Sequence, residues 1–444
     1  MHQLIHGDVL TVEVEGQFHA CLCDPPYHLY TEAPTWRVKL GEARTEADKQ
    51  ARRRYNGVAK GGFMGKHWDG GDIAFRPETW AKIGEHLLPG AFLMAFGSAR
   101  TYHRMACAIE EAGFRILPAI YWLNGSSFPK ATRIRVSGHS EVCECESPQL
   151  VEQTWAGHRY GGQVLKEACV PIVVAQKPYE GKPVESITRT GAGALNVEGG
   201  RIPTVVDDPN ARSATGDYSD SEGGDIFWLN HHRPATLVNG RWPANLVIDD
   251  SVVGAVNRQS GERPSGGGIK KRATGSAPGI FDINKIDGAY YEASTGGASR
   301  FFYRTSWALE EQEPFFYCAK SSRRERDAGL EGMPKAFCAT MGDGIGAREH
   351  NPEQPTAWVH NPHPTLKPLA LCKYLANLLL PPAEYAPRRI LVPFAGTGSE
   401  MIGAGLAGWE EVVGIEMETE YCDLAEKRLA HWLAAVPVLL PLVV

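Results

Sequence analysis

The chain has 444 residues, enough for roughly two or three domains or for one domain with large insertions. Apolar residues make up 43% of it, so it can bury a sizeable core, and a formal net charge of −6 excludes a globally basic protein. Any nucleic acid must therefore be bound by local patches. The ten cysteines form no regular framework and no apolar signal segment precedes them, so we expect a reducing, cytoplasmic location. The apolar tail from 432 to 444 is too short and too interrupted by proline to span a bilayer, and we expect it to pack on the body.

Apolar runs alternate with amphipathic stretches along most of the chain. Strands are expected at 1–8, 18–23, 91–96, 114–122, 170–176, 315–320 and 412–416, with another that begins at 390. Helices are expected at 77–88, 102–112, 368–380, 401–407 and around 421–429. Because the strands are continuously apolar and alternate with helices, they predict an α/β fold with a mostly parallel sheet covered on both faces.

The second apolar run ends in Asp24-Pro25-Pro26-Tyr27. Two prolines cannot continue a strand, so this tetrapeptide lies at a carboxyl strand end, where α/β sheets bind ligands. Asp24 and the Pro25 carbonyl can accept both N–H groups of a planar amine, and Tyr27 can stack on its ring. An ordinary Asp-Pro-Pro turn is the alternative.

A glycine turn follows the strand that begins at 390. Gly396 and Gly398 allow a ligand to approach the backbone, and the helix start beyond them offers free N–H groups. The next strand ends in Glu416, a position where an acidic residue commonly holds a ribose diol. A plain turn is the alternative.

Two polar regions carry local positive charge. The stretch 29–68 contains Arg52, Arg53 and Arg54, and is either a lid that contacts phosphates or a solvated insertion. The stretch 177–313 is rich in loop residues, and we interpret it as a separate module. It combines Lys270, Lys271 and Arg272 with interleaved aromatic residues, which fits a nucleic-acid face. The alternative, which composition alone favours, is an ordinary loop region with a small core.

No metal site is expected. Cys143 and Cys145 lie close to His139, but the spacing is C-x-C without a second pair nearby. Free cysteines are the better interpretation.

A further motif is Asn361-Pro-His-Pro-Thr-Leu-Lys-Pro368. Thr365 can cap the helix that follows, with Pro368 in its first turn.

Three motifs together resemble those of the amino-methyltransferases of DNA. They are the tetrapeptide at 24–27, the motif at 361–368, and the run at 394–398 with the later Gly-Ile-Glu416. The order of the motifs is similar to that of the permuted β group, in which the catalytic motif precedes the cofactor motif. The resemblance implies a Rossmann-like class I methyltransferase fold, circularly permuted, with an inserted loop-rich target-recognition region. It divides the chain into a catalytic half at 1–176, a target-recognition region at 177–313 and a cofactor-binding half at 314–444.

The resemblance also implies a cofactor, S-adenosylmethionine, and residues that hold it. Asp8 is expected near the adenine, Glu416 on the ribose hydroxyls, and Thr365 and Lys367 over the pocket. The methionine side is expected to be lined by Cys23, Pro393, Phe394, Ala395, Gly396 and Gly398.

Two departures from the family pattern stand out. The family usually has Asp before the Pro-Phe of the cofactor motif, where this chain has Val392. It also usually has a threonine-rich end, where this chain has Ser399 and Glu400. The missing carboxylate bears on cofactor affinity and activity.

The resemblance implies methylation of N6 of a flipped adenine in a specific DNA sequence, with Asp24, Pro25, Pro26 and Tyr27 as the catalytic residues. The chain contains no Pro-Cys dipeptide, the signature expected for methylation at cytosine carbon 5. N4 of cytosine, an RNA base, a protein amide and a catalytically silent DNA-binding homologue remain alternatives, and a nucleotide-binding dehydrogenase leaves two motifs unexplained. The expected partner is DNA, with a cognate restriction endonuclease possible, in a prokaryotic or phage-encoded monomer or homodimer. The recognition sequence does not follow from the residues.

Overall fold

The computed structural model describes residues 2–28, 67–69, 71–124, 130–134, 153–202, 242–248, 250–264, 295–296, 298–304, 321–337 and 358–434. Several sequence predictions lie outside these residues: Arg52, Arg53, Arg54, Lys270, Lys271, Arg272, the strand at 315–320 and the tail beyond 434. Within the described ranges, every helix is too short or too polar to cross a membrane.

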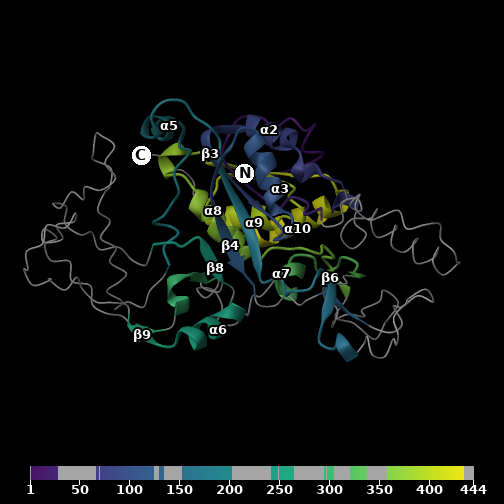
Figure 1. The fold of residues 1–444 in the computed structure, drawn as a ribbon. Helices are drawn as coiled ribbons and strands as arrows, with labels where there is room; N and C mark the ends of the chain where they lie inside the picture. The colour runs from purple at the N-terminus through teal and green to yellow at the C-terminus, as the bar shows by residue number, and fades with distance from the viewer. Residues whose placement is uncertain are drawn as a thin grey trace, which may run out of the picture.

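Nine strands form one sheet in the described part of the chain (Figure 1). In spatial order they are β1 (His2–His6), β15 (Glu411–Glu416), β14 (Arg389–Pro393), β2 (Phe18–Cys23), β3 (Leu87–Phe96), β7 (Cys169–Gln176), β4 (Arg115–Leu123), β8 (Leu246–Ile248) and β11 (Tyr303–Arg304). Neighbours are parallel except at β7, which is antiparallel to β3 and β4. The predicted mostly parallel, Rossmann-like α/β fold is confirmed.

Helices cover both faces of the sheet. The side chains of β2 alternate, so that Ala20 and Leu22 enter one apolar core and Cys21 and Cys23 enter the other. The first core also contains residues of α8 (Leu369–Leu379), α9 (Ser399–Ala407) and α10 (Thr419–Leu433). The second contains residues of α2 (Pro77–Glu85) and α3 (Tyr102–Glu111). The central strands β2, β3, β14 and β15 are therefore buried on both sides, which explains their unbroken apolar runs.

The strand order is circularly shifted. The chain runs outward from β14 through α9 to β15, and the amino-terminal β1 takes the next place beyond it. On the other side of β14, the chain runs outward from β2 to β3. The direction of winding thus reverses between β14 and β2, and their carboxyl ends form the topological switch point where open α/β sheets bind ligands.

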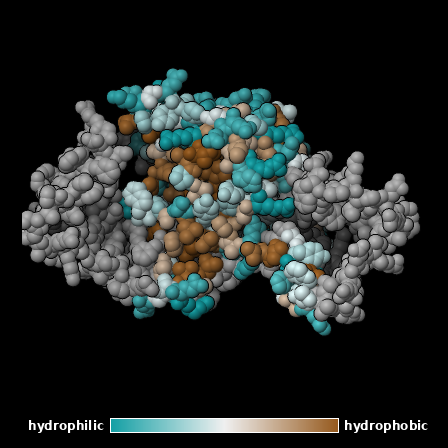
Figure 2. Space-filling model, in the orientation of Figure 1, coloured by the Kyte–Doolittle hydropathy of each residue, from teal (hydrophilic) through white to brown (hydrophobic). Residues whose placement is uncertain are grey.

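One expectation needs correction. The helix predicted at 77–88 ends at Glu85, because Leu87 is fully buried and pairs with Phe18 as the first residue of β3. The strands β8 and β11, which come from the region 177–313, extend the main sheet beside β4. Figure 2 shows apolar residues gathered over β4, β8 and α8 on the viewed face.

Short elements complete the described chain. Three two-stranded antiparallel sheets are formed by β5 (Lys130–Arg133) with β6 (Arg159–Gln163), β9 (Arg263–Pro264) with β10 (Thr295–Gly296), and β12 (Ala336–Phe337) with β13 (Trp358–Val359). The remaining helices are α5 (Pro183–Thr190), α6 (Asp250–Ser260) and α7 (Arg323–Asp327), with short 3₁₀ turns at His67–Asp69, Ile73–Phe75, Ala298–Phe301 and Ala383–Tyr385.

Candidate active site

The carboxyl ends of β2 and β14 carry unusual backbone. Among the described residues, positive φ outside glycine occurs at His28 (49°) and Phe394 (58°). His28 directly follows the tetrapeptide at 24–27, and Phe394 directly follows β14. Such conformations typically cost about 1–3 kcal/mol and cluster at functional sites. The strain at two adjacent strand ends marks this edge of the sheet as the candidate site.

Asp24 lies at this edge in contact with Lys367. The Lys367 ammonium donates to Asp24 Oδ2, and both side chains are largely buried, at 5% and 12% exposure. Asp24 Oδ1 is buried and accepts no hydrogen bond of normal geometry from the described residues. Lys367 was expected over the cofactor pocket; the structure places it on the Asp24 carboxylate, and Oδ1 of that carboxylate has no hydrogen-bond partner among the described residues.

Tyr27 packs beside this ion pair. The Lys367 ammonium lies 5.2 Å from the centre of the Tyr27 ring and 4.9 Å from that of Phe96. Thr101 Oγ1 donates to the Tyr27 carbonyl at 2.9 Å and fixes the backbone. Burial, and then the nearby Asp24 carboxylate, raise the pKa of the Tyr27 hydroxyl well above its ordinary value. Tyr27 therefore stays neutral, and the site holds an aromatic ring next to a carboxylate.

His28 holds the tetrapeptide from its other side. Its backbone N–H donates to Asp69 Oδ1 at 2.9 Å, its Nδ1 lies 3.2 Å from the Asp69 carbonyl, and its Nε2 accepts from the Ala74 N–H at 3.1 Å. These contacts fix a neutral tautomer, and burial lowers the pKa of His28. Sequence reasoning missed His28, although it directly follows the motif.

The glycine turn begins on the next strand. Gly396 and Gly398 both have positive φ, and α9 starts directly after them. A Cβ on Gly396 would lie 3.3 Å from His363 Nε2, so the turn favours glycine for its positive φ and leaves a side chain only a tight fit against His363. Glu416 accepts from the Gly396 N–H at 2.7 Å through Oε2, and from the Glu418 N–H at 2.9 Å through Oε1. Burial raises the pKa of Glu416.

The other cofactor candidates lie at the same edge. Asp8 lies two residues beyond the end of β1, whose His6 pairs with Glu416, and Asp8 Oδ1 accepts from the Leu10 N–H at 2.9 Å. Pro393 ends β14, and Ala395 donates through its N–H to the Ile415 carbonyl at 2.9 Å. The side chain of Cys23 is fully buried in the second core, so Cys23 can offer only its main chain to a ligand.

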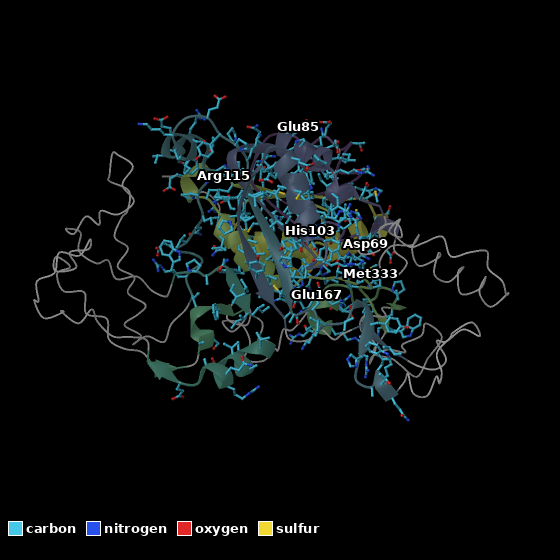
Figure 3. All side chains as sticks on the ribbon, viewed as in Figure 1. Asp69, Glu85, His103, Arg115, Glu167 and Met333 are labelled. Carbon is cyan, nitrogen blue, oxygen red and sulfur yellow. The ribbon has the colours of Figure 1, made fainter. Side chains whose placement is uncertain are left out.

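Three aromatic rings cover the glycine turn. His363 stacks on Trp68 with the ring centres 5.5 Å apart and an interplanar angle of 9°, and meets Tyr421 edge-on at 4.7 Å. Trp68 Nε1 donates to the Tyr421 hydroxyl at 3.2 Å. Trp68 and Met333 pack on one apolar cluster, and Figure 3 shows Met333 and Asp69 on the same side of the molecule. Segments from four parts of the chain therefore meet over this turn.

The helix α7 clamps the motif at 361–368. The buried Arg326 donates through Nη1 to the carbonyls of Asn361, at 2.9 Å, and His363. Glu325 Oε1 accepts from the Leu369 N–H at 2.6 Å, so Glu325 caps α8 from another segment. Thr365, the expected cap, makes no such bond, because the residue before α8 is Pro368. Thr365 instead offers its carbonyl to Lys367 at 3.3 Å.

Two buried ionisable residues of the site carried no functional assignment in the sequence. Glu400, in the first turn of α9, is 4% exposed and accepts a weak bond from Cys372 Sγ at 3.8 Å. Arg428 of α10 is fully buried and donates to the Thr397 carbonyl, Thr397 Oγ1 and Ser399 Oγ. Burial lowers the pKa of Arg428 to about 10. In the sequence, Glu400 stood out only as a departure from the family pattern. Arg428 belonged to the predicted amphipathic helix and carried no signal of a function.

Val392 does not face this polar edge. It is fully buried in β14 and packs in the first core. The departure at this position therefore replaces a carboxylate with an apolar core residue.

Solved structures resemble this chain at low TM-scores. The crystal structure of M1.HpyAVI is 12% identical, with 97% of this chain and 98% of that chain covered and a TM-score of 0.36. A putative DNA modification methylase from Thermus thermophilus, complexed with S-adenosyl-L-methionine, is 13% identical, with 98% and 97% covered and a TM-score of 0.34. PvuII DNA methyltransferase (cytosine-N4-specific) is 10% identical, with 96% and 86% covered and a TM-score of 0.34. No protein-family model matches the sequence, and the search of curated proteins found no match.

Proposed function

We propose that this protein is an S-adenosylmethionine-dependent methyltransferase that acts on the exocyclic amine of a base in DNA, with N6 of adenine as the target. The observation that carries the proposal is the set of contacts that the Asp24 carboxylate makes at the topological switch point. Lys367 occupies one carboxylate oxygen, and the other is buried beside Tyr27 without a partner of normal geometry in the described chain. An amine donor on a flat ring fits this arrangement.

The residues beside Asp24 fit the proposed cofactor. A Cβ at Gly396 would crowd His363 at 3.3 Å, and Glu416 and Asp8 place carboxylates near two neighbouring strand ends, where they suit a ribose diol. Phe394 and Ala395 are proposed to line the methionine side. S-adenosylmethionine supplies an electrophilic methyl group on a positively charged sulfur. The buried carboxylates of Asp24 and Glu400 suit a cation of that kind.

The proposed mechanism uses positioning and electrostatics. Asp24 Oδ1 and the Pro25 carbonyl accept the two amine N–H bonds, which draws the nitrogen lone pair out of conjugation with the ring. Tyr27 stacks on the base, and Pro26 keeps the turn rigid. Lys367 fixes the Asp24 carboxylate from its other oxygen, so that Asp24 does not rotate when a base enters. The amine loses one proton as the methyl group arrives, and Asp24 accepts it.

DNA is the proposed partner because the target amine must reach a buried carboxylate, which requires the base to leave the duplex stack. The division into a catalytic half at 1–176, a target-recognition region at 177–313 and a cofactor-binding half at 314–444 belongs to this proposal. The basic residues expected on phosphates, at 52–54 and 270–272, lie outside the described residues.

Methyl transfer from labelled S-adenosylmethionine to mixed-sequence duplex DNA tests the proposal. We expect label in N6-methyladenosine after digestion to nucleosides. Label in N4-methylcytidine keeps the mechanism and overturns the target base. Label in RNA but not in DNA overturns the substrate. Absence of heat in calorimetry with S-adenosylmethionine overturns the enzyme assignment in favour of a silent DNA-binding homologue.

A further inference from the structure

A two-stranded ribbon rises from the edge of the sheet that carries the candidate site. It consists of β5 and β6 with the flanking residues 153–158 and 164–167, and Figure 1 shows β6 reaching away from the main sheet. The ribbon lies between the carboxyl end of β4 and the start of β7, where the Asn124 N–H donates to the Ala168 carbonyl at 2.9 Å. Because β7 is antiparallel to both β3 and β4, and β3 is parallel to β2, β4 runs in the direction of β2. The ribbon therefore leaves the sheet at the edge that holds Asp24.

Contacts at its root place the ribbon beside the tetrapeptide at 24–27. Glu167 Oε1 accepts from the Ala99 N–H at 3.3 Å, and Thr101, two residues further along, donates to the Tyr27 carbonyl at 2.9 Å. Figure 3 shows Glu167 well away from Arg115, which begins β4 at the other edge of the sheet. A polymer that delivers a base to Asp24 and Tyr27 therefore passes next to this ribbon.

The ribbon is basic, although the chain has a net charge of −6. Residues 130–134 and 153–166 contain no acidic residue and four basic ones: Lys130, Arg133, Arg159 and Lys166. Arg133 lies directly opposite Arg159 across the two strands; both are exposed, and neither forms an ion pair in the part of the chain that the structure describes. The connecting stretch 135–152, with four glutamates and one arginine, lies outside the described residues. Like charges directly opposite each other destabilise a strand pair, so this pair suits an external anion better than it suits the fold.

Apolar side chains are exposed on the same ribbon. Eight large apolar side chains are exposed among the described residues, and four of them lie here: Trp155 (47% exposed), Tyr160 (56%), Val164 (38%) and Leu165 (83%). Trp155 meets His158 edge-on, with the ring centres 5.1 Å apart. Since side chains alternate along a strand, Tyr160 lies on the face opposite to Arg159, and both are exposed. An isolated two-stranded ribbon is marginally stable in water, which favours a partner that contacts both faces.

We propose that the β5–β6 ribbon enters a groove of duplex DNA beside the base that leaves the stack. The proposal rests on the proposed function and deepens it, since it assigns DNA contact to the part of the chain expected to be the catalytic half. Arg133 and Arg159 bind phosphates, and Trp155 and Tyr160 pack on bases and sugars within the groove. The major groove of B-DNA admits a two-stranded ribbon, and the phosphates along it supply the anions that the arginine pair lacks.

The salt dependence of DNA binding tests the two arginines. Fluorescence anisotropy of a labelled mixed-sequence duplex with the full chain, between about 50 and 200 mM salt, gives the slope of log K against log salt concentration. Each lost phosphate contact should reduce the magnitude of this slope by about 0.9. We expect that reduction in Arg133→Gln and in Arg159→Gln, and about twice as much in the double variant, with calorimetry showing unchanged S-adenosylmethionine affinity. Arg115→Gln, at an exposed position on the opposite edge, should keep the parent slope.

Two further measurements separate DNA contact from folding. Removal of the arginine pair should not lower the midpoint of urea unfolding, because the two like charges oppose each other in the free protein. Tyr160→Ser should weaken binding of the duplex by about tenfold, since an aromatic contact with a base is lost. Its salt slope should stay at the parent value, because that contact releases no counterion.

Each outcome decides between the ribbon and the proposed function. The parent slope in both arginine variants overturns the inference, and so does a reduced slope that comes with a lower urea midpoint. A parent dimer that Tyr160→Ser separates, with DNA affinity unchanged, assigns the ribbon to a second copy of this chain and also overturns it. A parent protein that binds S-adenosylmethionine but no duplex contradicts the proposed DNA substrate itself.

Discussion

Lys367 contacts the Asp24 carboxylate across 343 residues of sequence. The contact joins the end of β2 to the segment that leads into α8, and it is buried on both sides. Breaking a buried pair by removing one partner is strongly destabilising, because the remaining charge has lost its compensation. Variants at these positions must therefore keep volume and polarity if they are to report on chemistry rather than on folding.

Asp24→Asn should abolish methylation while leaving cofactor binding within a few-fold of the parent. The Asn side chain has one acceptor oxygen and one donor NH2 group, so it cannot present an acceptor to both Lys367 and the base amine, and we expect turnover to fall by about 10³ or more. Single-turnover methylation and calorimetry with S-adenosylmethionine measure the two effects separately. Full activity in Asp24→Asn contradicts the mechanism.

Lys367→Gln separates two roles for this lysine. As a positioning residue for Asp24, its replacement should reduce turnover by about 10² with cofactor affinity unchanged, because the carboxylate loses the partner that orients it. As a cofactor contact, the replacement should instead raise the Kd for S-adenosylmethionine. Lys335→Gln, on an exposed lysine, provides the control.

Arg326→Ala should loosen the motif at 361–368. The variant removes the donor to the carbonyls of Asn361 and His363, which then lie buried without it. The loss of hydrogen bonds from a buried charged donor should lower the free energy of unfolding by about 2–3 kcal/mol, which urea unfolding can measure.

Arg189 is exposed in α5 and provides the matched control for Arg326. Arg189→Ala should change the unfolding free energy by less than about 0.5 kcal/mol. Equal losses in the two variants contradict the clamp.

Gly396→Ala should weaken cofactor binding at the glycine turn. The added Cβ lies 3.3 Å from His363 Nε2 at a φ of 52°, so both the ring stack and the turn must shift. We expect a loss of at least tenfold in affinity for S-adenosylmethionine by calorimetry, since binding relies on the close approach of backbone.

Gly113→Ala separates strain from crowding. Gly113 also has positive φ, at 94°, but a Cβ there meets nothing within 4 Å among the described atoms. This variant should lose about 1 kcal/mol of stability and keep its cofactor affinity. If both variants lose affinity equally, the turn at Gly396 is not the binding element.

The contribution of His28 to the free energy of unfolding should fall as the pH drops below about 6.5. Burial lowers the pKa of His28 below its unfolded value of 6.5, so the unfolded chain takes up the proton first. The contribution of His28 is fully present above pH 6.5 and declines as the pH falls towards its folded pKa. Urea unfolding at pH 7.5 and pH 5 measures the effect. His28→Gln should reduce this dependence, whereas His103→Gln, at an exposed position, should preserve it.

Much of the sheet and its site edge could be predicted from short-range signals. The prolines at 25 and 26 end a strand, and the glycines at 396 and 398 allow a turn, because proline and glycine restrict or release backbone angles within their own residue. Continuous apolar runs likewise indicated strands buried on both faces. The boundary near Leu87 was wrong because its burial depends on pairing with Phe18, which the local pattern does not encode.

The contacts that define the chemistry came from the tertiary structure alone. The sequence by itself determined that Asp24, Lys367 and Glu400 exist and that two of them stand in motifs. Only the fold decided that Lys367 holds Asp24, that Glu325 rather than Thr365 caps α8, and that Glu400 is buried beside Cys372. Such relations depend on strands that pair across hundreds of residues, and burial, which sets the pKa of Glu400, is a property of the packed core rather than of any local segment.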